Sequence, residues 1–223
     1  IAQPENRQQL RTEVAACEQL GTTADDKQIY LYCHRGDSTV MREIGRLREL
    51  AFRAVEEGSG LRRDIDRFDP HYQHLVLWDE REWEIAGAYR FCPANTGLPL
   101  YTRTLFDFTS GMTPYLAQGL ELGRSFVQPG YWGKRSLDYL WYGIGAFLRR
   151  HPQHRYLFGP VSLSGAYPRP ALELLVHFYQ SHFPALQTLA VARHPFVIPP
   201  DRRAELNTRY PGTCYREEFQ QLK

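Results

Sequence analysis

Two charged residues three positions apart, Glu121 and Arg124, have side chains suited to proton transfer and to carboxylate binding. A glutamate can accept a proton from a reacting amine, and an arginine can orient a carboxylate through two parallel hydrogen bonds. In a regular strand, residues three apart point to opposite faces, so the pair acts together only where the strand bulges. Two interpretations stay open at this point, a reaction centre and an exposed ion pair.

The same stretch, "ELGRSFVQPGYWGKRSLDYL", continues through a loop with Gly133, Lys134 and Arg135 into a predicted helix capped by Ser136. A strand, a glycine loop and a helix place free backbone N–H groups and the positive end of the helix dipole at one point, which suits an anion. The loop has neither the GxxxxGK[ST] nor the GxGxxG spacing of nucleotide-binding loops. The alternative is an ordinary turn with solvated cations.

An acidic stretch, "RRDIDRFDPHYQH", gathers Asp64, Asp66, Asp69, His71 and His74 within eleven residues. Its spacing lacks the glycine and final glutamate of a calcium loop and the helical histidine pair of a zinc site, so we predict no metal. A solvated loop that turns at Asp69 is the simpler reading. His74, at the start of the next strand, is either a second proton acceptor or a histidine satisfied within the strand.

Composition limits the class of protein. The chain has 223 residues, 43% of them hydrophobic, and a net charge of +2, which gives no general attraction to nucleic acid. The four cysteines are far apart, without a CxxC pair, so neither a zinc ribbon nor a disulfide framework is indicated. No apolar run reaches the ~18 residues of a membrane span, and no export signal is present, so we expect a cytoplasmic protein. The first residue is Ile1, which suggests a piece of a longer polypeptide.

The elements that must position these residues follow from hydrophobic periodicity. Helices are predicted over 6–20, 136–150 and 170–183, and strands over 28–32, 74–78, 85–91, 120–127 and 156–163. A further helix is predicted to begin with an N-cap at Asp37 or Ser38 and to be stopped by Gly58 and Gly60. The pieces 74–78 and 85–91 are predicted to form an antiparallel hairpin. Residues 192–203 are rich in proline and are predicted to be a flexible connector. Together these elements predict one mixed α/β domain.

Five pieces in the expected order carry a resemblance to a known family, "RLRELAFRAVEEG", "DIDRFDPHYQHLVLWD", "IAGAYRF", "LELGRSFVQPGYWGKRSLDYLW" and "YLFGPVSLSGAYP". The chain resembles the GCN5-related N-acetyltransferase (GNAT) superfamily, in its hemolysin-like branch of ornithine-lipid-type long-chain N-acyltransferases. The resemblance implies a three-layer fold, a twisted mixed sheet that is splayed at its centre and flanked by helices. It also implies a linker or helix from a preceding domain over 1–28, the acyltransferase core over 29–190 and a truncated extension over 191–223.

The donor loop departs from the family pattern. Aligned to R/Q-x-x-G-x-G/A, the sequence "YWGKRSL" places Arg135 and Leu137 where two glycines hold pyrophosphate. The resemblance therefore implies an acyl carrier protein as donor, with coenzyme A as the alternative and no bound cofactor. The donor-binding residues that it implies are Phe126, Val127, Gly133, Lys134, Arg135 and Ser136.

The resemblance implies transfer of a fatty acyl group to the amine of an amino acid or similar small acceptor. It assigns catalysis to Glu121 and Arg124, and acceptor binding to Asp66, Asp69 and Arg124. From residue type and position we add His74 as a candidate catalytic residue, and Ser162 and Ser164 as candidates for hydrogen bonding to the acceptor or to the pantetheine. The resemblance leaves open a peripheral contact with the inner membrane. The alternatives are acetyl transfer from acetyl-coenzyme A and a non-catalytic module, fused to a lysophospholipid acyltransferase, that binds an acyl carrier or lipid.

Overall fold

The computed structural model describes residues 1–222, which divide into two compact units. The first unit is Ile1–Thr102 with Pro114–Val161, and the second is Arg103–Thr113 with Ser162–Lys223. The helices are α1 (Arg7–Ala15), α2 (Thr39–Arg53), α3 (Thr113–Leu116), α4 (Ser136–Arg150), α5 (Arg169–His182), α6 (Pro200–Arg209) and α7 (Tyr215–Gln221). The strands are β1 (Glu18–Thr22), β2 (Gln28–Cys33), β3 (Gln73–Asp79), β4 (Glu84–Pro93), β5 (Phe106–Phe108), β6 (Gly119–Val127), β7 (Tyr156–Phe158) and β8 (Ala190–Ala192).

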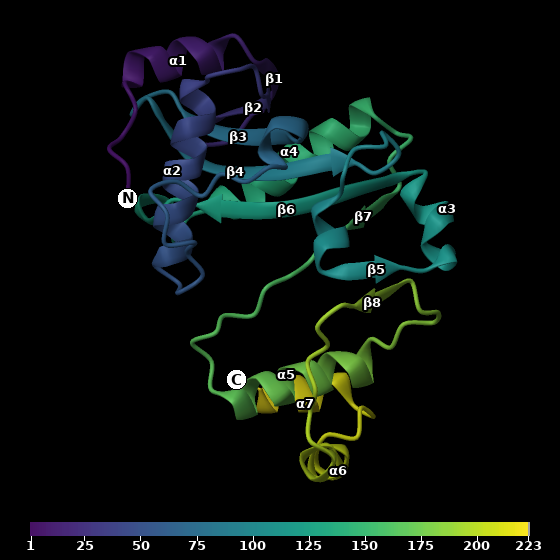
Figure 1. Ribbon diagram of the computed structural model, residues 1–223. Helices are drawn as coiled ribbons and strands as arrows, with labels where there is room; N and C mark the ends of the chain where they lie inside the picture. The colour runs from purple at the N-terminus through teal and green to yellow at the C-terminus, as the bar shows by residue number, and fades with distance from the viewer. Residues whose placement is uncertain (223) are drawn as a thin grey trace. The chain divides into compact units, whose positions relative to one another are not determined.

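The first unit is built on a six-stranded mixed sheet in the order β1-β2-β3-β4-β6-β7. Neighbouring strands are antiparallel except β6 and β7, which run parallel and pair only from Gly119 to Glu121. Beyond Glu121, β6 continues to Val127 without a partner strand on that side among residues 1–222. The predicted mixed sheet with flanking helices is confirmed (Figure 1).

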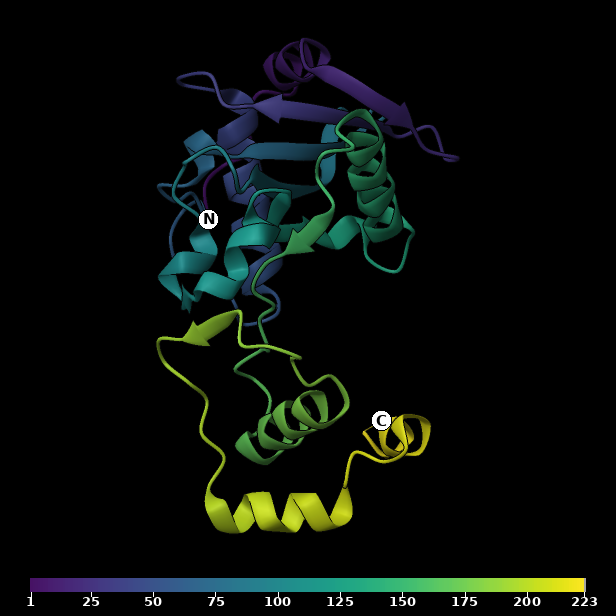
Figure 2. The same cartoon turned by 90° about the vertical axis from the view of Figure 1, so that its right-hand side faces the viewer.

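Alternation along the strands gives the sheet two apolar faces. Tyr30, Val76 and Ala88 pack under α1 and α2. Their neighbours in the chain, such as Leu31 and Leu75, face the other way and pack under α4. Figure 2 shows the green α4 and the blue α2 on opposite sides of the strands. Each face of the sheet is therefore covered by a helix.

Local signals in the sequence explain where the helices lie. Ser38, one of the two predicted N-cap residues, caps α2, because its hydroxyl accepts a hydrogen bond from the Met41 N–H. Gly143 lets α4 approach the sheet closely, since a Cβ at that position would lie 2.5 Å from a Leu75 methyl group.

Three predicted elements were too long. The helix predicted to continue until Gly58 ends at Arg53, because Glu56 has a positive φ of 62° that does not continue a right-handed helix. The helix over 6–20 ends at Ala15, because residues from Glu18 pair with β2 instead. The strand over 156–163 ends at Phe158, where its pairing with β6 stops. Leu10 and Val14 of α1 belong to the core beneath α2.

The second unit pairs β5 with β8 as an antiparallel ribbon and holds α5, α6 and α7. Ile198, Leu206 and Tyr210 form its small core with Leu174 and Val176. Part of the predicted connector is helical, since α6 begins at Pro200. Across residues 1–222, no helix is both long and apolar enough to span a membrane.

Candidate active site

A bulge in β6 sets the direction of Arg124. Arg90 of β4 lies opposite Gly123 and Ala88 lies opposite Phe126, so two residues of β6, Arg124 and Ser125, face one residue of β4. Arg124 has a φ of 51°, in the left-handed region that residues other than glycine rarely adopt. The extra residue turns Arg124 toward the face of α2, where Glu121 also lies. The two residues therefore share one face of the sheet.

Three arginines and three aspartates form a closed ring of ion pairs on this face. Around the ring, the closest nitrogen–oxygen distances are 3.2 Å for Arg48–Asp64, 3.2 Å for Asp64–Arg124, 3.6 Å for Arg124–Asp66, 2.7 Å for Asp66–Arg90, 2.9 Å for Arg90–Asp69 and 2.8 Å for Asp69–Arg48. We call this set the Arg–Asp ring. Its charges alternate and sum to zero, so each buried ion has two oppositely charged neighbours.

The Arg–Asp ring has a buried side and an accessible edge. The side chains of Arg48, Asp69 and Arg90 are at most 1% exposed, whereas those of Asp66 and Arg124 are 22% and 26% exposed. Burial opposes the charge of Asp69, but Arg48 and Arg90 outweigh it and hold the pKa of Asp69 far below its ordinary value. Asp69 is thus fully paired inside the protein, and Asp66 is the aspartate with access to solvent.

Unused hydrogen-bonding atoms concentrate in the Arg–Asp ring and beside it. Asp66 Oδ2, Arg124 Nε, Arg90 Nε and Nη2, and Thr102 Oγ1 are buried and have no hydrogen-bond partner among the described residues. Arg90 and Arg124 both lie beside the Tyr101 ring, at 5.6 and 5.4 Å from its centre. Buried polar atoms without partners are rare in proteins, so their concentration here marks a place where a ligand can supply the missing bonds.

Glu121 is 1% exposed, and both its oxygens accept hydrogen bonds. The Tyr72 hydroxyl and the Tyr101 N–H donate to Oε2, the latter over 3.1 Å, and the Thr102 N–H donates to Oε1 over 2.6 Å. The Tyr101 N–H also donates to the Tyr72 hydroxyl oxygen at 2.8 Å. Glu121 therefore joins β6 to the chain at Tyr101 and Thr102.

His74 lies behind the Arg–Asp ring, fully buried, with Nε2 3.1 Å from the Asp69 carbonyl oxygen. Burial disfavours the imidazolium and lowers the pKa of His74 to about 4, although the neighbouring Asp69 acts in the opposite direction. His74 is therefore neutral at pH 7. Its surroundings make it a weak base, which fits a histidine satisfied within the strand better than a proton acceptor.

Replacing His74 should change how stability responds to pH. The pKa of His74 is lower in the folded protein than the ordinary 6.5, so folding favours the neutral form and the protein loses stability as pH falls from 6.5 toward about 4. Between about pH 7.5 and about pH 5 the loss is on the order of 2 kcal/mol. His74→Gln should remove this part of the pH dependence, measured by urea unfolding at both pH values. An unchanged dependence would contradict the buried, neutral His74.

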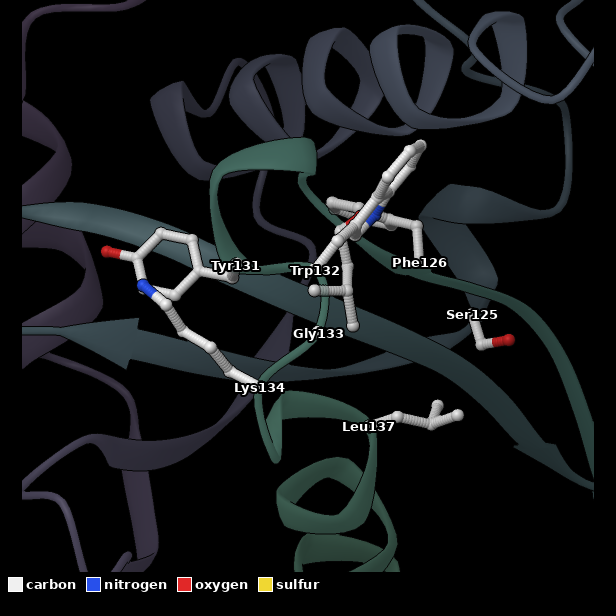
Figure 3. A pocket seen from close by; sticks show the side chains of 8 residues that line it. Ser125, Phe126, Tyr131, Trp132, Gly133, Lys134 and Leu137 are labelled. Atoms are coloured by element: carbon white, nitrogen blue, oxygen red, sulfur yellow. The ribbon is translucent and has the colours of Figure 1, made fainter.

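A cavity of about 450 Å³ lies beside the bulge. It is lined by Ser125, Phe126, Val127, Tyr131, Trp132, Gly133, Lys134 and Leu137, which include four of the residues predicted to bind the donor (Figure 3). Its volume is in the range of small-molecule sites. Because Arg124 and Ser125 are consecutive, the cavity and the Arg–Asp ring meet at the bulge.

The cations of the donor loop border this cavity unequally. Lys134 extends to the Tyr131 ring, with Nζ 4.9 Å from the ring centre, as Figure 3 shows. Arg135 is exposed and bonds the Tyr142 hydroxyl at 2.8 Å. The predicted helix cap is wrong, because α4 begins at Ser136 and its N-cap residue is Arg135, which makes no capping bond. Ser136 is buried, and its hydroxyl has no hydrogen-bond partner in residues 1–222.

The remaining predicted residues and the missed ones fall into two groups. Ser162 and Ser164 belong to the second unit, so their role in acceptor binding stays a prediction. The prediction missed Arg48, Tyr72, Arg90 and Tyr101. Arg48 and Arg90 did leave a signal, because each is a charged residue at a core-facing position of an otherwise apolar pattern.

No cluster suited to a metal ion occurs in the part of the chain that the structure describes.

Comparisons with known proteins identify the family of the chain. Residues 47–142 match the family model described as an acetyltransferase (GNAT) domain. The whole chain aligns with glycine N(alpha)-acyltransferases, at 34% identity over 71% of the protein of Bacteroides thetaiotaomicron and at 32% identity over 74% of that of Phocaeicola vulgatus. An L-ornithine N(alpha)-acyltransferase of Brucella abortus is 31% identical over 64% of this chain and 62% of its own length. No solved structure matches the chain.

Proposed function

Because the chain belongs to the GNAT family, in the branch of the glycine and L-ornithine N(alpha)-acyltransferases, and is an acyltransferase, we propose that it acylates the α-amine of a free amino acid. The donor is a thioester of a long-chain fatty acid. The reaction forms an amide C–N bond and breaks the C–S bond, while the amine loses a proton and the thiolate gains one. The product is a lipoamino acid.

The accessible edge of the Arg–Asp ring is the observation that supports an amino-acid acceptor. It offers one carboxylate and one guanidinium side by side, Asp66 and Arg124, each with an atom that has no hydrogen-bond partner among the described residues. A free amino acid carries the complementary pair of charges, since its ammonium suits Asp66 and its carboxylate suits Arg124. The ion pair between Asp66 and Arg124 is the longest in the ring, 3.6 Å, so little attraction is lost when a zwitterion separates the two side chains.

Glu121 is our proposed proton acceptor for the attacking amine. Three donors, the Tyr72 hydroxyl and the N–H groups of Tyr101 and Thr102, fix the orientation of its carboxylate. Glu121 lies on the same face of the sheet as Arg124. Tyr101 contacts both residues, because its N–H donates to Glu121 and its ring lies beside Arg124. Tyr101 therefore links Glu121 to the edge of the Arg–Asp ring where the acceptor is proposed to bind.

The cavity beside the bulge is our proposed site for the thioester arm. An extended arm can lie along the free side of β6 beyond Glu121, as an added strand would, and reach the bulge from the cavity. Phe126, Val127 and Leu137 supply an apolar lining for the acyl end, and Lys134 supplies a positive charge for a phosphate. Acyl carrier protein, with its acidic surface, is the proposed donor, and coenzyme A is the alternative.

Product identification tests the proposed function directly. The full chain is incubated with palmitoyl acyl carrier protein or palmitoyl-coenzyme A and with glycine or L-ornithine, and the lipids are analysed by mass spectrometry. We expect N-palmitoyl amino acid with at least one acceptor. Release of free fatty acid alone would contradict the proposal, and acetylation of the same acceptors by acetyl-coenzyme A alone would assign the chain to short-chain transfer.

Charge reversal in the donor loop should weaken the interaction with acyl carrier protein. Lys134→Glu with Arg135→Glu replaces attraction with repulsion toward an acidic surface, so KM for acyl carrier protein should rise ~10-fold or more and depend less on salt. Steady-state kinetics at two salt concentrations measure both effects. Arg149→Glu with Arg150→Glu, at the other end of α4, makes the same change in net charge and should leave KM unchanged.

Equal KM values for the two double variants would exclude the loop as the docking surface. Loss of binding to anionic lipid vesicles, without a change in KM for the carrier, would instead assign these cations to a membrane surface.

A further inference from the structure

The Tyr72 hydroxyl, the Tyr101 N–H and Glu121 Oε2 form a triangle of hydrogen bonds in the first unit. The hydroxyl donates to Glu121 Oε2 and accepts the Tyr101 N–H at 2.8 Å, while the same N–H lies 3.1 Å from Glu121 Oε2. Tyr72 is 3% exposed. Burial, together with the bond to Glu121, raises the pKa of Tyr72 above its ordinary value, so the hydroxyl keeps its proton and remains a donor.

The triangle controls a side chain that faces the proposed acceptor. The Tyr101 backbone is held by Tyr72 and Glu121, and its ring centre lies 5.4 Å from the Arg124 guanidinium carbon. Arg124 has a left-handed backbone and an Nε without a hydrogen-bond partner in residues 1–222. Its side chain is held by ion pairs of 3.2 and 3.6 Å and by the Tyr101 ring, so the position of that ring matters. A shift of the Tyr101 backbone would therefore move the ring that contacts Arg124 and change the orientation of the guanidinium.

We propose that Tyr72 is a positioning residue for acyl transfer, which fixes Tyr101 and through it the orientation of Arg124 toward the acceptor's carboxylate. This inference rests on the proposed function, in which Arg124 binds that carboxylate. Tyr72 acts on the acceptor side alone, because none of its partners lines the donor cavity. It consequently determines the preference for amino acids over simple amines.

Tyr72→Phe isolates this role. The phenyl ring keeps the edge contact with Phe68, at 6.1 Å between centres, and the position over Arg90, at 4.9 Å, while the hydroxyl is lost. Tyr30→Phe is the matched control, since Tyr30 is also a buried tyrosine whose hydroxyl bonds a side chain, that of Gln28, away from the ring. Both variants lose the hydroxyl of a buried tyrosine, and only Tyr72→Phe should affect the use of the acceptor.

The experiment compares kcat/KM for glycine and for methylamine in the wild type and both variants, with one acyl donor. In Tyr72→Phe we expect the ratio of the two efficiencies to fall about tenfold, with KM for the donor unchanged, whereas Tyr30→Phe keeps the wild-type ratio. If the role of Tyr72 is purely structural, kcat/KM for glycine and for methylamine falls by the same factor and their ratio stays at the wild-type value. That result would overturn the inference.

Two further outcomes keep the test decisive. A wild type without any preference for glycine would refute the proposed acceptor mode and this inference together, whereas a wild-type preference that survives in Tyr72→Phe refutes the inference alone. If Tyr72→Phe does not fold, Tyr101→Leu removes the ring beside Arg124 but keeps the backbone N–H. It should cause the same selective loss, and an unchanged ratio there also overturns the inference.

Discussion

Glu121→Gln should lower kcat by ~10²-fold or more, with KM for the acyl donor little changed. The amide keeps the size of the side chain and one acceptor oxygen but cannot take the proton of the amine. Stopped assays of amide formation over a range of pH measure the effect. Because the proton acceptor itself is removed, the loss should persist at every pH.

The chain offers a close control for this replacement. Glu13 also accepts one hydroxyl and two backbone N–H groups, from Ser38, Thr39 and Val40, but it joins α1 to the start of α2. Glu13→Gln should lower the free energy of unfolding and leave kcat near the wild-type value. If Glu121→Gln does the same, Glu121 is an anchor for the Tyr101 backbone, and the proton leaves through solvent.

Amino acids should be better acceptors than the amines that lack their carboxylate. Removing the carboxylate forfeits a charge-assisted contact with Arg124 of ~1.5–3 kcal/mol, which corresponds to roughly ten- to a hundredfold in kcat/KM. The measurement pairs glycine with methylamine and L-ornithine with putrescine under a single acyl donor. Equal efficiencies within each pair would remove Arg124 from acceptor binding.

Arg124→Gln should abolish this preference, because the amide cannot form the two-pronged contact with a carboxylate. Arg42→Gln is the matched control, since Arg42 is similarly exposed, 32% against 26%, and also pairs with two carboxylates, Glu5 and Asp37. The control should retain the preference. A preference that survives in Arg124→Gln would point to Arg90 as the group that holds the carboxylate.

Periodicity predicted the large elements of the fold well. Helix α4 has the predicted bounds, and the hairpin of β3 and β4 lies where alternation placed it. The errors occur where partners distant in sequence decide the structure. Residues from Glu18 form a strand because β2 offers them hydrogen bonds, and nothing within the segment itself signals this.

The candidate site was predicted only in part, for a related reason. Asp66, Asp69 and Arg124 were identified by residue type and family pattern. The Arg–Asp ring that unites them was not, because Arg48 and Arg90 come from a helix and a strand far apart in the sequence. Residue type also failed to separate Asp66, which reaches solvent, from Asp69, which does not. Burial decides that difference, and burial depends on the whole fold.

The additional residue in β6 makes the chemistry of this protein sensitive to a change of one codon. Deleting Ser125 would equalise the two strands and restore strict alternation, so Arg124 would point to the side of α4. The sheet could still form, but Asp64 and Asp66 would lose their shared arginine. In an alignment of related sequences, a one-residue gap opposite 124–125 should therefore mark proteins that keep the architecture and have lost or changed the acceptor.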